Sequence, residues 1–176
     1  MDIVEERLDK DKHFTIIGDF KCGADDPLDL FLTDFSFEYD RKRLGITYLL
    51  LDDSSKTVLA FYTIKTNAIQ MVEEKGEFNA LPMIEIARIA VHYELQHNGI
   101  GRMLFYDYIL PKVREIEKLV AVYGIMVFVD RYNQNGISFY KSIGFQAADP
   151  SIQNMIGETF NEECDLYILR LDNETN

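Results

Sequence analysis

One short stretch of this chain, residues 96–102, constrains its fold and chemistry more than any other. It follows an apolar run over residues 83–91 that is typical of a β-strand, and it opens a helix-like run over residues 101–118. The first backbone N–H groups of a helix lack partners within the helix and carry the positive end of its dipole. Glycines at positions 99 and 101 remove the Cβ atoms that would keep an anion away from those amides. The pattern predicts a pyrophosphate-binding loop, although a turn that simply needs glycine would read the same. The stretch consists of Gln96, His97, Asn98, Gly99, Ile100, Gly101 and Arg102.

Two familiar phosphate-binding motifs are excluded by the residues that follow Gly101. A P-loop needs Lys and then Ser or Thr after this glycine, whereas the chain has Arg102 and Met103. A dinucleotide-binding turn needs a third glycine three residues later, and that position is Leu104. The predicted loop therefore belongs to neither motif.

A second constellation follows another apolar run, over residues 125–130. Here Asn133 is followed by Tyr140 and then by a Gly-Phe pair. Together with the first stretch, this spacing resembles the GNAT superfamily of N-acetyltransferases, whose pattern is Gln/Arg-x-x-Gly-x-Gly/Ala after the fourth strand, then Asn, Tyr and Gly-Phe. Residues 88–91, directly before the loop, match as well. The resemblance extends over residues 84–145 and rests on Gln96, Gly99, Gly101, Asn133, Tyr140, Gly144 and Phe145.

A third segment is similar to one branch of that superfamily. It reads Phe20, Lys21, Cys22 and Gly23, and it continues with Leu28, Asp29, Phe31 and Leu32. The branch includes toxins of toxin–antitoxin pairs that acetylate aminoacyl-tRNA, so the resemblance implies tRNA and a small antitoxin as candidate partners. The same residues also fit a strand end, a turn and an amphipathic first helix. Branch membership alone does not name a substrate, because one fold hosts many functions.

The resemblance and the order of apolar segments predict the fold class. The resemblance implies an α/β (α+β) fold: a mixed, mostly antiparallel GNAT-type sheet of six to seven strands, flanked by helices, with splayed central strands. A chain of 176 residues is expected to form one domain over residues 1–176, with residues 1–12 and 172–176 flexible. Pro111 is expected to kink or split its helix. Strands are predicted at residues 13–20, 46–51, 58–66, 83–91, 125–129 and 166–171, helices at 27–39, 101–118 and 134–142, and loops at 71–81 and 150–163.

The net charge of −12 bears on the acceptor. It opposes non-specific binding of a polyanion, which depends on Lys and Arg side chains that neutralise phosphates. It suits a cationic acceptor such as a polyamine, an amino sugar or a basic peptide. RNA stays open, because local patches matter more than the total charge. The candidate basic patches are Arg41, Lys42 and Arg43, and Lys112 with Arg114, for which ordinary solvated surface is the alternative.

The composition also leads to expectations about the location of the protein, the state of its cysteines and the presence of a metal. No run approaches the ~18 apolar residues of a membrane span, and the acidic start does not look like a signal peptide, so a cytoplasmic protein is expected. Cys22 and Cys164 are too few for a disulfide framework and are expected to be reduced thiols. No His/Cys cluster has metal-ligand spacing, so no metal is expected. We expect a monomer or a homodimer.

The resemblance implies most of the binding roles, with acetyl-CoA as the cosubstrate. The strand that ends at Val91 would leave backbone groups free along Ile89, Ala90 and Val91 to bind the acetyl carbonyl and the pantetheine arm. Residues 96–102 would hold the pyrophosphate, and Arg102 would add a charge-assisted contact. Asn133 is expected to hydrogen-bond the pantetheine amide, with a helix cap as the alternative.

The same resemblance makes Tyr140 the predicted general acid, placed to protonate the sulfur of CoA. A phenol with an ordinary pKa near 10 is a suitable donor to a basic thiolate, and core packing beside Phe139 is the alternative. The general base stays open. Glu85 comes first because it is an odd residue within an apolar strand, while His92, a water chain or an amine that is already neutral are the alternatives.

The predicted activity is transfer of an acetyl group to a primary amine by direct attack in a ternary complex. The acceptor is expected to be a small cationic amine or a peptide amine. Toxin-type acetylation of aminoacyl-tRNA is the alternative. A non-catalytic module that binds CoA or a partner is a third interpretation, which the presence of Tyr140 disfavours.

Overall fold

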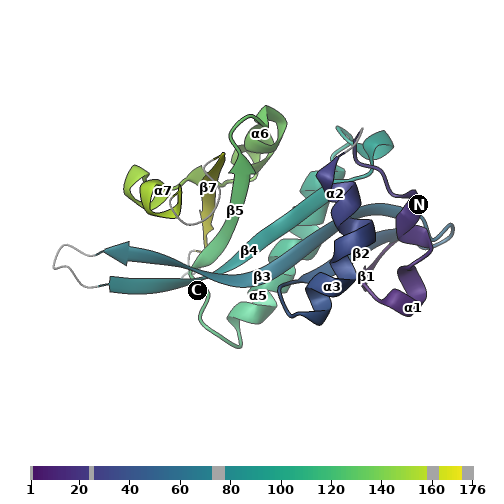
Figure 1. Ribbon diagram of the computed structural model, residues 1–176, viewed down its shortest axis with the longest axis horizontal. Helices are drawn as coiled ribbons and strands as arrows, with labels where there is room; N and C mark the ends of the chain where they lie inside the picture. The colour runs from purple at the N-terminus through teal and green to yellow at the C-terminus, as the bar shows by residue number, and fades with distance from the viewer. Residues whose placement is uncertain (1, 24–25, 73–77, 158–162, 172–176) are drawn as a thin grey trace. The chain divides into compact units, whose positions relative to one another are not determined.

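The computed structural model describes residues 2–23, 26–72, 78–157 and 163–171 (Figure 1). The chain forms two compact units, each made of two segments. The first unit comprises Met1–Lys65 and Ile86–Lys112, and the second comprises Thr66–Glu85 and Val113–Asn176. The expectation of one domain over residues 1–176 stays a prediction.

Seven strands form one hydrogen-bonded sheet in the order β1-β2-β3-β4-β5-β7-β6. The pairs β1/β2, β2/β3, β5/β7 and β6/β7 are antiparallel, whereas β4 and β5 pair in parallel. The predicted mixed, mostly antiparallel α/β sheet flanked by helices is therefore confirmed (Figure 1). The strands are β1 Ile3–Arg7, β2 Ile46–Asp52, β3 Val58–Val72, β4 Phe78–Val91, β5 Gly124–Asp130, β6 Gln146–Ala147 and β7 Cys164–Arg170.

The three predicted helices are present, at residues 27–41, 100–117 and 134–142. The first two combine α-helical and π-helical segments that follow one another without a break. The helical segments are α1 Lys10–His13, η1 Ile16–Asp19, α2 Pro27–Leu30, η2 Phe31–Phe35, α3 Ser36–Arg41, η3 Tyr93–Leu95, α4 Ile100–Met103, η4 Leu104–Ile109, α5 Leu110–Glu117, α6 Gln134–Ser142 and α7 Pro150–Gly157.

The N-terminal segment differs from the expectation. The strand expected over residues 13–20 is wrong, because the end of α1 and the 3₁₀ helix η1 lie there. The first strand is instead β1, within the stretch that was expected to be flexible. The carboxylate of Asp9 starts α1 by accepting the backbone N–H groups of Asp11 and Lys12 at 2.9 and 3.2 Å. This capping side chain accounts for α1, whereas η1 has no side-chain cap.

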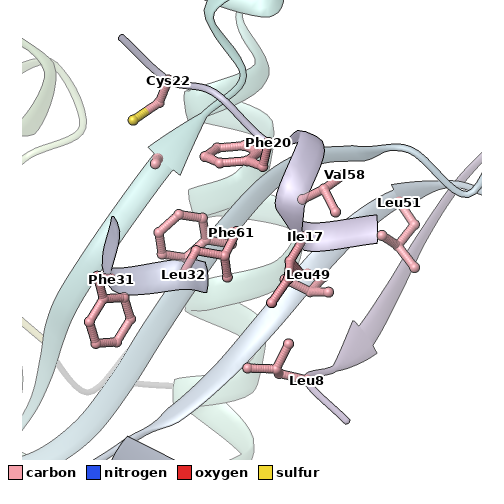
Figure 2. Close-up of a cluster of buried hydrophobic side chains, with 11 residues drawn as sticks. Leu8, Ile17, Phe20, Cys22, Phe31, Leu32, Leu49, Leu51, Val58 and Phe61 are labelled. Carbon is pink, nitrogen blue, oxygen red and sulfur yellow. The ribbon is translucent and has the colours of Figure 1, made fainter. Parts of the chain in front are cut away.

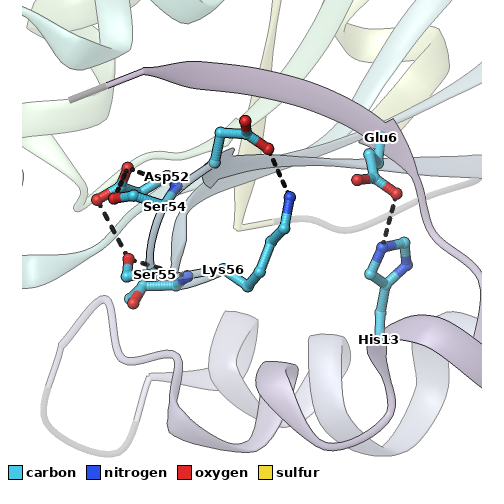
Figure 3. A network of polar contacts seen from close by, with 8 residues as sticks. Glu6, His13, Asp52, Ser54, Ser55 and Lys56 are labelled. Carbon is cyan, nitrogen blue, oxygen red and sulfur yellow. Dashed lines mark hydrogen bonds and ion pairs between the residues drawn. The ribbon is translucent and has the colours of Figure 1, made fainter.

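A buried histidine fixes α1 to β1. His13 is 2% exposed, and its Nδ1 accepts the backbone N–H of Asp9 at 2.9 Å. Its Nε2 lies 3.3 Å from a carboxylate oxygen of Glu6 on β1 (Figure 3). Because Nδ1 accepts, Nε2 carries the proton and donates to Glu6. This pair anchors the chain start to the sheet.

The hairpin strands β3 and β4 are longer than predicted. The loop expected over residues 71–81 is wrong at both ends, since β3 continues to Val72 and β4 begins at Phe78. Residues 73–77 lie outside the described residues. Thr66 and Gln70 are exposed on β3 whereas Ile69 is buried, so the polar residues occupy the outer face of a strand.

Pro111 does not split the helix that begins at Ile100. It is the second residue of α5, directly after the π-helical segment η4. A π turn shifts the backbone hydrogen-bond pattern by one residue, which accommodates the N–H that proline lacks. The helix continues to Glu117, so the expected break does not occur.

The second unit contains one helix that was not predicted. α7 lies where a loop over residues 150–163 was expected, and residues 158–162 lie outside the described residues. Asp149 accepts the backbone N–H of Ser151 at 2.9 Å, which caps the helix start. The side-chain amide of Gln153 donates to and accepts from the backbone of Leu166 at 2.8 and 2.9 Å, which ties α7 to β7.

Each unit buries its own apolar cluster. In the first unit the cluster joins η1, the helix that starts at Pro27, the strands β2 and β3 and the end of β4 (Figure 2). It therefore anchors the strand end from which the predicted loop departs. This cluster consists of Leu8, Ile17, Phe20, Cys22, Phe31, Leu32, Leu49, Leu51, Val58, Phe61 and Ala90. The cluster of the second unit consists of Ile69, Met83, Met126, Ala148 and Leu166.

Candidate active site

The candidate residues fall into two groups, one in each unit. The first unit holds the end of β4 and the loop of residues 96–102. The second unit holds Glu85, Asn133 and Tyr140.

The loop has the backbone form that an anion cradle needs. His97 and Gly99 both adopt positive φ, at 62° and 82°. Gly99 is the N-cap of α4, and its carbonyl accepts the first helical hydrogen bond, from Met103 N at 3.0 Å. A Cβ placed on Gly99 would meet nothing within 4 Å. The helix start is therefore open on this side, as an approaching phosphate would require.

Gln96 braces the loop with its side chain. Its amide Nε2 donates to the carbonyl of Val91 at 3.0 Å and to the carbonyl of Cys22 at 2.6 Å. The first bond closes the loop onto the end of β4, and the second joins it to the segment after Phe20. Both bonds use the side-chain amide of Gln96, so this side chain stabilises the conformation of the loop.

The end of β4 leaves its pairing with β5 early. The parallel register covers Met83, Ile84 and Glu85, which lie opposite Gly124, Ile125 and Met126. β4 continues to Val91 beyond this register. Ala90 is buried in the cluster of the first unit, whereas Ile89 and Val91 are half-buried. The backbone of Ile89, Ala90 and Val91 therefore lies on a strand segment outside the β5 register.

His92 follows that strand and is fixed by packing. Its ring lies 5.9 Å from the ring of Phe20 and 4.8 Å from that of Tyr93, centroid to centroid. Its backbone N–H donates to the carbonyl of Leu59 at 2.8 Å. These contacts hold the turn that leads into η3.

Asn133 caps α6. Its Oδ1 accepts the backbone N–H of Gly136 at 2.8 Å. The capping bond occupies the carbonyl oxygen of the side chain, and the amide donors point elsewhere. The exposed Asn133 can therefore cap the helix and still donate to a ligand carbonyl.

Tyr140 lies on α6 and is buried in an aromatic group. Its ring makes edge contacts with Phe139 and Phe145, at centroid distances of 5.2 and 5.4 Å. The backbone N–H of Phe145 returns to the carbonyl of Tyr140 at 3.0 Å, which fixes the Gly-Phe pair beside it. Burial raises the pKa of Tyr140 above its ordinary value. A phenol is protonated at neutral pH even at its ordinary pKa near 10, as a general acid must be.

Glu85 is a buried carboxylate, 5% exposed, at the last residue of the β4/β5 register. Its Oε2 accepts a hydrogen bond from the side-chain amide of Asn67 at 2.6 Å. Asn67 lies on β3, and its own Oδ1 accepts the backbone N–H of Ala68 at 2.8 Å. Of the two orientations that the strand pattern left open for Glu85, the structure excludes the solvent-facing one.

Four of the five cations in the candidate basic patches are paired with carboxylates. Glu38 lies 2.6 Å from Arg41 and 3.3 Å from Lys42, and hydrogen bonds from these two residues lower the pKa of Glu38 to about 2. Two further pairs are Lys112 with Glu5 and Arg114 with Glu117, each at 2.8 Å. Paired cations have less charge to offer to a phosphate backbone.

The sequence patterns did not predict the contacts of two polar residues, Asn67 and Asp29. Asn67 lies in a strand, where asparagine is disfavoured, and this disfavoured placement was the only signal. Asp29 was named within the third segment, but its burial was not predicted. Asp29 is 6% exposed and accepts the backbone N–H of Cys22 at 2.8 Å.

A mixed sheet with a parallel β4/β5 pair, and an open glycine-bearing helix start after β4, is an arrangement that suits a protein with a phosphate-bearing ligand. The chain belongs to the acetyltransferase (GNAT) family, whose sequence profile matches residues 19–145. It is an acyltransferase.

Structures of the toxin AtaT and of KacT are among the solved structures that share this fold. The toxin AtaT complexed with acetyl-methionyl-tRNAfMet is 22% identical, with a TM-score of 0.74, and the match covers 96% of this chain and 95% of that one. A mutant of AtaT bound to the C-terminus of the antitoxin AtaR and acetyl-CoA is also 22% identical, with a TM-score of 0.75 and coverages of 97% and 94%. A mutant of KacT is 20% identical, with a TM-score of 0.75 and coverages of 97% and 95%. At these identities the likeness establishes the fold.

Two features are absent from the part of the chain that the structure describes. None of their helices is long and apolar enough to cross a membrane. Within the same residues, no group of three or more His, Cys, Asp or Glu side chains could hold a metal ion.

Proposed function

We propose that this protein is an acetyl-CoA-dependent N-acetyltransferase that acts on a primary amine by direct attack in a ternary complex. The open helix start at Gly99 carries the proposal, because a Cβ there would meet nothing within 4 Å in a family defined by acetyl transfer. In this proposal the amides of residues 96–102 hold the pyrophosphate of acetyl-CoA, and Arg102 adds a charge-assisted contact.

The remaining roles follow from the two groups of side chains. Backbone N–H groups along Ile89, Ala90 and Val91 bind the acetyl carbonyl and the pantetheine arm, and Asn133 donates to a pantetheine carbonyl. As the amine nitrogen bonds to the acetyl carbon, the carbon–sulfur bond breaks. Glu85 accepts the proton that the amine loses, and Tyr140 gives the leaving thiolate its proton.

The acceptor in this proposal is a small cationic amine or a peptide amine. The net charge of −12 attracts cations, and Arg41, Lys42, Lys112 and Arg114 are paired with carboxylates. The test is thiol release from acetyl-CoA in the presence of a polyamine, an amino sugar or a basic peptide, with Tyr140→Phe as the matched variant. Release that depends on both the amine and Tyr140 supports the proposal. Binding of CoA without release would leave a non-catalytic module.

The second candidate function is toxin-type acetylation of aminoacyl-tRNA, with an antitoxin as partner. The full-length likeness to AtaT and KacT favours it. Its test is transfer of labelled acetyl from acetyl-CoA to charged tRNA, with the same tRNA uncharged as control. Label only on charged tRNA supports this function, and label on neither excludes it. A cytoplasmic location, and a monomeric or homodimeric state, stay predictions.

A further inference from the structure

Asp29 is a buried carboxylate that takes no part in the proposed chemistry. It lies on α2 of the first unit and is 6% exposed. A buried charge is costly unless hydrogen bonds or an opposite charge compensate it. The Nζ of Lys21 lies 3.9 Å away and is more than half exposed, so it compensates little. The close contact of Asp29 is its bond from the backbone N–H of Cys22, at 2.8 Å.

Cys22 is held on its other side by the candidate loop. Its carbonyl accepts Gln96 Nε2 at 2.6 Å, and the same amide donates to Val91 at 3.0 Å. One residue earlier, the carbonyl of Lys21 accepts the backbone N–H of Tyr93 at 2.8 Å. Figure 2 shows Cys22 and Phe20 on one segment, and both belong to the buried cluster of this unit. A continuous chain of contacts therefore runs from Asp29 through Cys22 to Gln96.

The thiol of Cys22 belongs to this arrangement as a neutral group. Burial raises its pKa, and a hydrogen bond to Asp29 raises it further. A thiol in that state is a hydrogen-bond donor and not a nucleophile. Cys22 therefore contributes through its backbone, whose carbonyl accepts the amide of Gln96, and not through its thiol.

We propose that Asp29 is a positioning residue for the loop of residues 96–102, an inference that rests on the proposed function of that loop. Asp29 fixes the backbone of Cys22, the carbonyl of Cys22 fixes the amide of Gln96, and Gln96 closes the loop onto the end of β4. The contacts give Cys22 and Asp29, which have no other assigned role, a task at the acetyl-CoA site.

Three variants of the full chain test the inference by CoA affinity, measured calorimetrically. Asp29→Ala removes the acceptor and is expected to weaken CoA binding about tenfold, as loss of a charge-assisted hydrogen bond does. Asp29→Asn keeps an acceptor oxygen in place and is expected to bind CoA like the wild type. Asp34→Ala, an exposed carboxylate on the same helical stretch, is the matched control and is expected to bind CoA unchanged.

Amide hydrogen exchange without ligand separates positioning from a general loss of structure. In Asp29→Ala, faster exchange at residues 96–99 with unchanged exchange in β7 supports the inference. Should Asp29→Ala fail to fold, Gln96→Ala breaks the same chain of contacts at its other, half-buried end, and it must then reproduce both effects. Unchanged CoA affinity and loop exchange in the folded variant overturn the inference and leave the proposed function intact. A wild-type protein that does not bind CoA overturns both.

Discussion

The side-chain amide of Asn67 donates a hydrogen bond to the carboxylate of Glu85 at 2.6 Å, from β3 to β4. The orientation of that amide is set by its own carbonyl oxygen, which accepts the backbone N–H of Ala68 at 2.8 Å. A donor held in this way fixes the position of the buried carboxylate on β4. Glu85 therefore has a defined place in the strand, as a group with a role in proton transfer needs.

Glu85→Gln is predicted to lower turnover by about 100-fold, because general bases contribute factors of this size. The glutamine is similar in shape and can still bond Asn67, so the CoA affinity should not change. Steady-state kinetics with acetyl-CoA and a cationic amine measure the first effect, and calorimetry measures the second. Glu115→Gln on the exposed face of α5 is the matched control. Unchanged turnover in Glu85→Gln would remove it from the role of base.

Tyr140→Phe is predicted to retain CoA affinity and to lose most of its turnover. The ring contacts with Phe139 and Phe145 persist in the variant, and only the proton is lost. Because burial raises the pKa of Tyr140, the wild-type phenol stays protonated across the neutral range. Turnover equal to that of the wild type would show that another group protonates the thiolate.

Gly99→Val is predicted to abolish CoA binding. At a φ of 82° a branched side chain is strained, and its Cβ would occupy the open space in front of the helix start. Gly18→Val is the control, since a Cβ there also meets nothing within 4 Å and this exposed glycine lies in η1. Calorimetric titration of both variants with CoA separates a blocked site from general damage. Normal binding by Gly99→Val would place the phosphate site elsewhere.

The protein is predicted to lose stability as the pH rises above about 10. Burial raises the pKa of Tyr62 and of Tyr140, and a hydrogen bond to Glu5 raises that of Tyr62 further. In the unfolded chain both phenols lose their protons at their ordinary pKa near 10, and the folded chain resists this loss. The stability that these groups contribute is therefore complete below that pH and declines above it.

Urea unfolding at about pH 8 and about pH 11 measures this decline. Tyr62→Phe is expected to reduce the difference in unfolding free energy between the two conditions. Tyr132→Phe, at an exposed position, should leave the difference as in the wild type. The same decline in all three proteins would contradict the assignment.

The sequence patterns predicted the elements that carry strong periodicity. The helices at residues 27–41, 100–117 and 134–142 were found because their apolar spacing is regular over several turns. The strand expected at residues 13–20 was wrong because a short apolar pattern fits a helical turn as well as a strand, and the end of α1 and η1 lie there. β1 was missed because its alternation includes charged residues on an edge strand, where charge is common.

Some parts of the candidate site could be predicted from the sequence, whereas the contacts of others could not. Glycine spacing marks a helix start directly, so the loop around Gly99 could be read from the chain. The partners of Glu85 and Cys22 could not be, because Asn67 and Asp29 reach them through strand register and helix placement. The sequence around a polar residue in a strand or helix does not show which residue it will contact in the folded chain.

The most direct test of the proposed function is a competition between two acceptors, a polyamine and charged tRNA, in a single reaction mixture. Labelled acetyl-CoA is offered with a polyamine and with charged tRNA at equal concentrations, and the label in each fraction is counted against a Tyr140→Phe control. We predict label on the polyamine, none on the tRNA, and little of either with the variant. Label confined to charged tRNA would contradict the proposal of a cationic acceptor and would assign the protein to the toxin-type enzymes. Label on neither acceptor would contradict acetyl transfer to a polyamine and to charged tRNA alike.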